Sequence, residues 1–239
     1  MSWRDRLAFL CSRRIQTCAV RGQTIRIDAS TYLEFIRART YATKEPDTLG
    51  WIDRYGGPGT VLYDVGANIG LYSLYAAVRE PHMQVVAFEP WDKNRAALWR
   101  NQQLNGRSFP CVPVAVSDHD GRGTLQMRGV ARGQTGTFVP GHGEIQSVTL
   151  DTYVRLSLAP HPTMLKIDVD GHEEAVLRGA RQTLADPRLD TVLIEIEGDV
   201  PHRRITAQMQ QAGLHPVSVS DWTVRSRAGL PVRNYVFAR

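Results

Sequence analysis

One segment constrains the fold most: residues 61–77, VLYDVGANIGLYSLYAA, join an apolar strand to a helix through a tight turn. Asp64 stands near the end of the strand, and Gly66 and Gly70 allow a sharp turn that a ligand can approach closely. The turn contains neither Gly-x-Gly-x-x-Gly nor a terminal Gly-Lys-Ser/Thr, the patterns that bind phosphate groups. It therefore predicts a ligand site in which phosphate is not the group bound.

Beyond Thr60, short apolar segments alternate with segments of helical period, which is typical of an α/β fold with a mainly parallel sheet and helices on both faces. The expected strands are Val61–Val65, Gln84–Phe88, Cys111–Val116, Met164–Val169, Thr191–Ile196, His215–Val219 and Asn234–Ala238, with an antiparallel last strand. The expected helices are Leu71–Arg79, Asp92–Leu104, Glu173–Leu184 and Arg203–Ala212. The glycine-rich residues 119–150 predict a hairpin and a mobile loop.

The first 59 residues are interpreted as a cap on a Rossmann-like domain at 60–239, rather than as an independent unit. Residues 17–28 predict a hairpin that turns at Arg21 and Gly22, and residues 46–60 predict a helix that ends at a Gly/Pro stretch. With 239 residues, 42% of them hydrophobic, the chain can supply one full core.

Charge and cysteine content indicate the surroundings of the protein. The net charge of +5 comes from scattered arginines, and it permits an anionic partner without requiring one. Three cysteines without metal-ligand spacing predict reduced thiols and a cytoplasmic protein, and no stretch approaches the ~20 apolar residues of a membrane span. Within residues 1–14, Trp3, Leu7, Phe9 and Leu10 among arginines allow peripheral contact with a membrane, and a plain docking helix is the alternative.

The next strand tip carries Glu89, 19 residues after Gly70. A carboxylate at about this distance usually accepts hydrogen bonds from both ribose hydroxyls. A ribose at a turn without phosphate-binding glycines suits an adenosine with a cationic amino-acid tail, which is S-adenosylmethionine. Asp64 would then complement the ammonium or sulfonium group, although both carboxylates would also serve as caps of adjacent helices.

Five segments together resemble the FkbM-type S-adenosylmethionine-dependent methyltransferases: VLYDVGANIGLYSLYAA, VVAFEPWDKNRAALWRNQQLNG, VPVAVSDHDG, VTLDTYV and MLKIDVDGHEEAVLRGA. The resemblance covers residues 45–197. It implies a class I methyltransferase fold and methyl transfer, typically to hydroxyls of secondary metabolites, glycolipids or glycans. It also implies cofactor-binding residues at Asp64, Gly66, Asn68, Gly70 and Glu89, with Ser117 and Asp118 bordering the adenine. Residues 198–239 follow no family pattern, and we expect them to shape the acceptor pocket together with residues 1–59.

The segment KIDVDGHEE holds the candidate catalytic residues. Lys166 and Asp168 interrupt a central strand and share one face, which predicts an ion pair. Asp168 at the strand tip is also a candidate to orient the acceptor, to act as base or to hold the methionine part of the cofactor. Asp170 and Glu173 predict a capping box, and His172 is a candidate base or a surface residue.

The sequence also bears on metal binding and on three rival functions. Asp168 and Glu195 at neighbouring strand tips would begin a Mg²⁺ site, but no third ligand is evident, so we expect no metal. A nicotinamide dehydrogenase would require the missing Gly-x-Gly-x-x-Gly. A nucleic-acid methyltransferase suits the basic charge but lacks Asp/Asn-Pro-Pro-Tyr/Phe, so nucleic acid is disfavoured as a partner. A cofactor-binding module without catalysis stays open.

Overall fold

The computed structural model describes residues 3–156, 159–220, 224–225 and 229–239. A central eight-stranded sheet runs in the order β12-β14-β11-β10-β3-β4-β5, and β13 pairs with β14 beside this path. The strands are β3 (Val61–Val65), β4 (Gln84–Phe88), β5 (Cys111–Val112), β10 (Met164–Ile167), β11 (Thr191–Glu197), β12 (His215–Val219), β13 (Val224–Arg225) and β14 (Pro231–Ala238). Strands β11, β10, β3, β4 and β5 are parallel to one another. Strand β14 is antiparallel to β11, β12 and β13, which confirms the predicted sheet.

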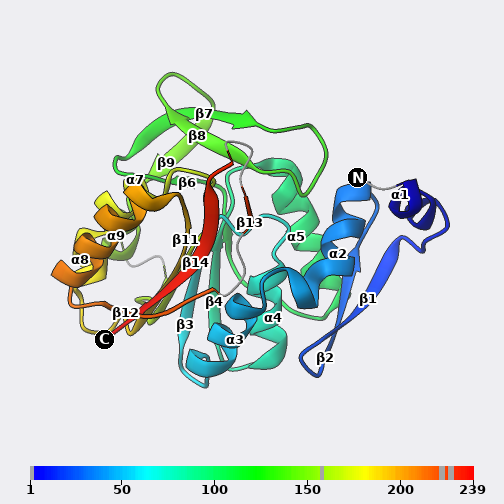
Figure 1. Ribbon diagram of the computed structural model, residues 1–239, viewed down its shortest axis with the longest axis horizontal. Helices are drawn as coiled ribbons and strands as arrows, with labels where there is room; N and C mark the ends of the chain where they lie inside the picture. The colour runs from blue at the N-terminus through cyan, green and yellow to red at the C-terminus, as the bar shows by residue number, and fades with distance from the viewer. Residues whose placement is uncertain (1–2, 157–158, 221–223, 226–228) are drawn as a thin grey trace.

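Helices cover both faces of this sheet (Figure 1). They are α4 (Leu71–Arg79), α5 (Asp92–Leu104), α6 (Leu150–Arg155), α7 (Glu173–Arg178), α8 (Arg181–Ala185) and α9 (Asp199–Gln211). One apolar cluster joins α6–α9 to the sheet through residues such as Val176 and Met209, and a second joins α4 through Leu74. Every residue of β3 is buried, as a central parallel strand between two helical layers requires.

The N-terminal elements pack onto the second face. They are α1 (Trp3–Leu10), β1 (Ile15–Val20), β2 (Gln23–Asp28), α2 (Tyr32–Lys44) and α3 (Pro46–Tyr55). The β1–β2 hairpin turns at Arg21 and Gly22, as predicted, and both residues have positive φ. In α3, the indole N–H of Trp51 donates to the Thr191 hydroxyl of β11 at 3.0 Å. Helix α2 was not expected from the sequence, although a capping box of Thr31 and Glu34 begins it.

The expected strand Cys111–Val116 is wrong, because it is two strands. Pro113 lacks an N–H and cannot continue the ladder, and the chain leaves the central sheet there. Its second half, β6 (Ala115–Val116), joins a small sheet with β7 (Gly121–Met127), β8 (Gly136–Pro140) and β9 (Ile145–Val148). The predicted hairpin is β7–β8, whereas part of the expected loop forms β9. This small sheet lies across the top of the molecule in Figure 1.

The expected helix Glu173–Leu184 is also divided, into α7 and α8. A Cβ at Gly179 would overlap the carbonyl oxygen of Ser117, so the backbones of these two residues touch. The Gly179 carbonyl accepts the N–H of Asp151 at 3.0 Å and leaves the helical pattern. The break therefore results from a tertiary contact that the helical period does not reveal.

The structure also describes the cysteines and the length of the helices. Cys11, Cys18 and Cys111 are free thiols, and burial raises the pKa of Cys18 to about 11 and that of Cys111 to about 12. Among the residues that the structure describes, no helix is long and apolar enough to cross a membrane.

Candidate active site

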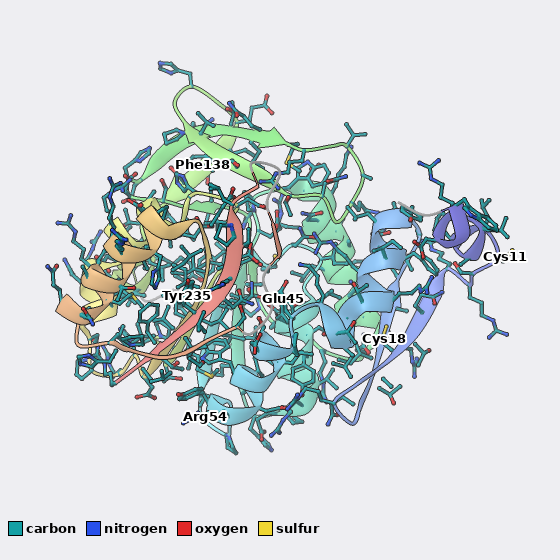
Figure 2. The ribbon with its side chains drawn as sticks, in the orientation of Figure 1. Cys11, Cys18, Glu45, Arg54, Phe138 and Tyr235 are labelled. Carbon is teal, nitrogen blue, oxygen red and sulfur yellow. The ribbon has the colours of Figure 1, made fainter. Side chains whose placement is uncertain are left out.

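A pocket of about 1050 Å³, including its open mouth, lies at the carboxyl ends of β3, β4, β10 and β11. Its floor is residues 66–69 of the turn together with the strand tips, whereas Gly70, predicted to bind the cofactor, does not line it. From the small sheet, β7 and β8 contribute Leu125, Met127 and Phe138. From α2 and its C-terminal end come Arg37, Lys44 and Glu45. Figure 2 shows Phe138 on the small sheet and Glu45 beside the N-terminal helices. Among the described residues, none from 198–239 lines the pocket, so the expected contribution of that segment is wrong for its described part.

The turn after β3 has the shape predicted from its glycines. The N–H groups of Gly66 and Ala67 both donate to the carbonyl of Phe88 at 3.0 Å. Gly66 has φ +83°, and a Cβ there would overlap the carbonyl oxygen of Asp168. Gly70 has φ +82°, and a Cβ there would press on Leu98. Both positions therefore require glycine, and the turn lies directly against the end of β10.

Glu89 forms the adjoining wall of the pocket at the tip of β4. Its carboxylate accepts the N–H of Asn68 at 2.8 Å and the N–H of Trp91 at 2.9 Å. Burial raises the pKa of Glu89 to about 7, against the opposing effect of these hydrogen bonds. The structure thus presents a buried carboxylate beside the glycine turn, with lone pairs left for further donors.

Asp64, by contrast, does not line the pocket. Its carboxylate accepts the Ser73 hydroxyl at 2.5 Å and lies 3.5 Å from the ammonium of Lys166. Lys166 is 3.1 Å from Asp168, so the predicted ion pair of Lys166 and Asp168 is confirmed. Asp64 is buried beneath the turn and orients Lys166, instead of reaching a ligand directly.

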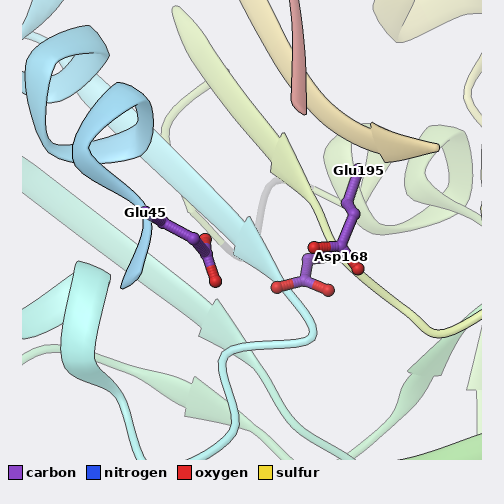
Figure 3. Close-up of side chains that lie close together, drawn as sticks. All are labelled: Glu45, Asp168 and Glu195. Carbon is purple, nitrogen blue, oxygen red and sulfur yellow. The ribbon is translucent and has the colours of Figure 1, made fainter. Parts of the chain in front are cut away.

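Three carboxylates meet at the pocket: Glu45, Asp168 and Glu195 each offer an oxygen, all within 4.8 Å of one another (Figure 3). Sequence reasoning missed Glu45, because its position depends on how α2 and α3 pack on the sheet. The ammonium of Lys44 lies 2.7 Å from the carboxylate of Glu45, and the ammonium of Lys166 pairs with the carboxylate of Asp168.

The members of this cluster differ in protonation. Burial alone would raise the pKa of Asp168, but the positive charges of Lys166 and Lys44 hold it below its usual range. Burial raises the pKa of Glu195 well above its usual range, and the charges of Asp168 and Glu45 add to this effect. The surroundings therefore favour the ionised form of Asp168 and the neutral form of Glu195.

His172 also lines the pocket, with contacts of its own. Its Nε2 lies 2.9 Å from the hydroxyl of Ser117, which in turn donates to Asp118 at 3.3 Å. Phe138 packs edge-on against the imidazole at a centroid distance of 5.6 Å. Burial lowers the pKa of His172, and the charge of Asp118 opposes that shift. The histidine is therefore neutral near pH 7, and its nearby carboxylate is Asp118 rather than Asp168.

The remaining predicted residues need two corrections. Ser117 and Asp118 do not line the pocket; Val114, Ala115 and Val116 do, because Ser117 turns inward to His172 and Asp118 pairs outward with Arg178 at 2.8 Å. The predicted capping box of Asp170 and Glu173 is absent. Helix α7 begins only at Glu173, whose carboxylate accepts the N–H groups of Gly171 at 3.0 Å and Val169 at 3.3 Å.

The pocket contains the groups that S-adenosylmethionine would need. Glu89 suits the ribose hydroxyls, and the apolar side chains of Leu125, Met127 and Phe138 suit a flat adenine ring. Arg37 keeps its terminal nitrogens for a carboxylate, since only its Nε has a hydrogen bond among the described residues, to the carbonyl of Gly133 at 2.8 Å. The residues present therefore fit this cofactor.

Comparison with known families gives one match that covers most of the chain. The family model for the methyltransferase FkbM domain matches residues 64–215. This methyltransferase family implies S-adenosylmethionine as the methyl donor. The match confirms the resemblance stated from the sequence, but with other bounds: it begins at residue 64 instead of 45, and it extends to residue 215, so the expectation that residues 198–239 follow no family pattern is wrong for 198–215.

Individual relatives cover smaller shares. The hexuronic acid methyltransferase AglP of Haloferax volcanii is 27% identical over 155 residues, which are 64% of this chain and 63% of the relative. The 31-O-demethyl-FK506 methyltransferase FkbM of Streptomyces tacrolimicus is 45% identical over 67 residues, 27% of this chain and 25% of the relative. The chain therefore spans less than two thirds of either protein.

A solved S-adenosylmethionine-dependent methyltransferase from Agrobacterium tumefaciens shares the fold. The TM-score is 0.59 at 9% sequence identity, and the superposition covers 95% of this chain and 71% of the other. The predicted class I methyltransferase architecture is thereby confirmed.

Proposed function

We propose that this chain, which belongs to the FkbM methyltransferase family, transfers a methyl group from S-adenosylmethionine to a hydroxyl of a small molecule, glycan or glycolipid. The observation that carries the proposal is the pocket, which joins a ribose-type carboxylate to two candidate groups for handling an acceptor hydroxyl. Relatives named for a hexuronic acid and for 31-O-demethyl-FK506 support a hydroxylated acceptor.

In this proposal, Asp168 and His172 act on the acceptor. S-adenosylmethionine supplies an activated methyl group on a sulfonium. Lys166 and Lys44 keep Asp168 ionised, so its carboxylate can accept a hydrogen bond from a neighbouring hydroxyl of the acceptor and so orient the reacting oxygen, whose own proton faces His172.

His172 then takes the proton. With the Ser117 hydroxyl donating to Asp118, the Nε2–H of His172 donates to Ser117 and leaves a lone pair on Nδ1, an assignment that follows from the hydrogen-bond network. The charge of Asp118 stabilises the imidazolium that forms. A positioned base of this kind contributes about 10²–10⁴-fold to the rate.

A screen of hydroxylated acceptors with methyl-labelled cofactor tests the proposal. Label is expected in a sugar acid or another polyhydroxylated acceptor, as a methyl ether that mass spectrometry identifies. Cofactor binding without label transfer to any acceptor would favour the non-catalytic module. Label in RNA or DNA, with retention on a DNA column at physiological salt, would favour the nucleic-acid alternative.

Cofactor affinity is expected to rise with pH up to about 7 and then level off. In the free protein, burial raises the pKa of Glu89 to about 7, so the carboxyl is protonated below that pH. Ribose hydroxyls donate to the ionised form, so binding releases a proton and affinity gains up to about tenfold per pH unit below the pKa. Calorimetry with S-adenosylhomocysteine in buffers of different ionisation heat measures both effects. Glu89→Gln should remove the slope, and a slope that persisted would belong to another group.

Turnover is expected to survive chelation by EDTA. Glu45 and Asp168 already have the ammonium groups of Lys44 and Lys166 as partners, and burial favours the neutral form of Glu195, so the three oxygens offer little net negative charge to a divalent ion. If EDTA abolished turnover and Mg²⁺ restored it, Glu45, Asp168 and Glu195 would instead be metal ligands.

A further inference from the structure

Helix α1 exposes a row of large apolar side chains. Trp3 is 71% exposed, Leu7 57% and Leu10 78%. At about 100° per residue, these three positions lie within an arc of about 60° on one face of the helix. Figure 1 shows α1 at the outer edge of the molecule, next to α2. Ile15, the first residue of β1, is 44% exposed and adds to the apolar surface of this region.

The other face of α1 is anchored to α2, which fixes the direction of the exposed row. The ring of Phe9 lies 5.8 Å from that of Tyr32 and 5.6 Å from that of Phe35. Asp5 forms an ion pair with Arg39 at 3.3 Å. Asp5 and Phe9 lie about 150° around the helix from the centre of the row. Packing against α2 therefore turns Trp3, Leu7 and Leu10 away from the protein.

The charges around this row are positive. Residues 3–14 contain four arginines and one acidic residue, Asp5, which Arg39 already neutralises. Arg6 and Arg13 are exposed. Apolar side chains that include a tryptophan, flanked by arginines, suit the interface of a bilayer with anionic head groups.

We propose that α1 docks the protein on an anionic phospholipid membrane, with Trp3, Leu7 and Leu10 inserted at the interface. Residues 1 and 2 of the N-terminal segment lie outside the described residues. Helix α2 links this surface to the pocket: Tyr32, Phe35 and Arg39 contact α1, whereas Arg37 and Lys44, on the opposite face, line the pocket. The pocket is thus separated from the docking helix by α2, whose diameter is about 10 Å.

Vesicle co-sedimentation of the full chain tests this surface. We expect sedimentation with vesicles of equal parts phosphatidylcholine and phosphatidylglycerol, and much less with phosphatidylcholine alone. The double variant Leu7→Ser/Leu10→Ser should lower partitioning by about tenfold or more, because two apolar side chains leave the interface. Trp3→Ser should weaken binding, whereas the matched variant Trp99→Ser, at an indole 60% exposed on α5, should not.

Three results would overturn the proposal. The first is unchanged partitioning of Leu7→Ser/Leu10→Ser, and the second is full binding to the anionic vesicles by Arg6→Gln/Arg13→Gln. The third is self-association in light scattering that Leu7→Ser/Leu10→Ser abolishes, which would assign the row to a second copy of the chain. Calorimetry with S-adenosylhomocysteine is expected to give wild-type affinity for Leu7→Ser/Leu10→Ser, so loss of docking is distinguishable from failure of the proposed function.

Discussion

Asp168→Asn and His172→Ala are each expected to lower turnover by about 10²-fold or more while changing cofactor affinity little. Asp168→Asn keeps the shape of the side chain but removes the charge that Lys166 and Lys44 maintain. His172→Ala removes the neutral imidazole that Ser117 holds. Single-turnover rates and calorimetry with S-adenosylhomocysteine separate chemistry from binding. Only His172→Ala should flatten the dependence of the rate on pH.

A second His–Asp pair supplies the control. The Nε2 of His161 lies 3.4 Å from the Asp186 carboxylate, and neither residue lines the candidate active-site pocket. His161→Ala and Asp186→Asn should therefore leave turnover near the wild-type level. Because Asp168 and His172 act on the same acceptor, replacing both should cost less than the sum of the free-energy costs of the two single replacements. Wild-type turnover in both Asp168→Asn and His172→Ala would show that the base lies elsewhere.

Glu89→Ala is expected to weaken S-adenosylmethionine binding at least tenfold. The variant removes one or two charge-assisted hydrogen bonds to the ribose, each worth roughly 1.5–3 kcal/mol. It also removes the acceptor for the N–H of Asn68, which fixes the glycine turn. Isothermal titration calorimetry measures the loss, and NAD should not bind to either protein.

Glu173 is the matched control for this measurement. Like Glu89, it is a buried carboxyl that accepts two backbone N–H groups, and burial raises its pKa to about 7. It does not line the pocket. If Glu173→Ala weakened cofactor binding as much as Glu89→Ala, the loss would reflect disturbed folding instead of a ribose contact.

Local sequence pattern was sufficient to predict the bounds of the helices and strands that depend only on their own residues. The bounds of β3, β4, α4 and α5 agree with the sequence expectation, because apolar period and glycine positions act within a few residues. Local pattern did not predict the elements that depend on contacts with residues distant in the chain. Gly179 divides a helix only because it touches the backbone of Ser117, and Pro113 redirects its strand into a sheet completed by residues 136–148.

The same division runs through the site. Sequence pattern predicted the glycine turn, the carboxylate of Glu89 at a strand tip, and the pairing of Lys166 with Asp168, since strand ends and alternation along a strand are local properties. Three other features follow from how the elements pack: Asp64 lies beneath the pocket, Glu45 joins Asp168 and Glu195, and Ser117 contacts His172. Those contacts join residues that are far apart in the chain. The packing of α2, β10 and β11 brings these residues together, and the periodicity of the sequence does not predict which distant residues will meet.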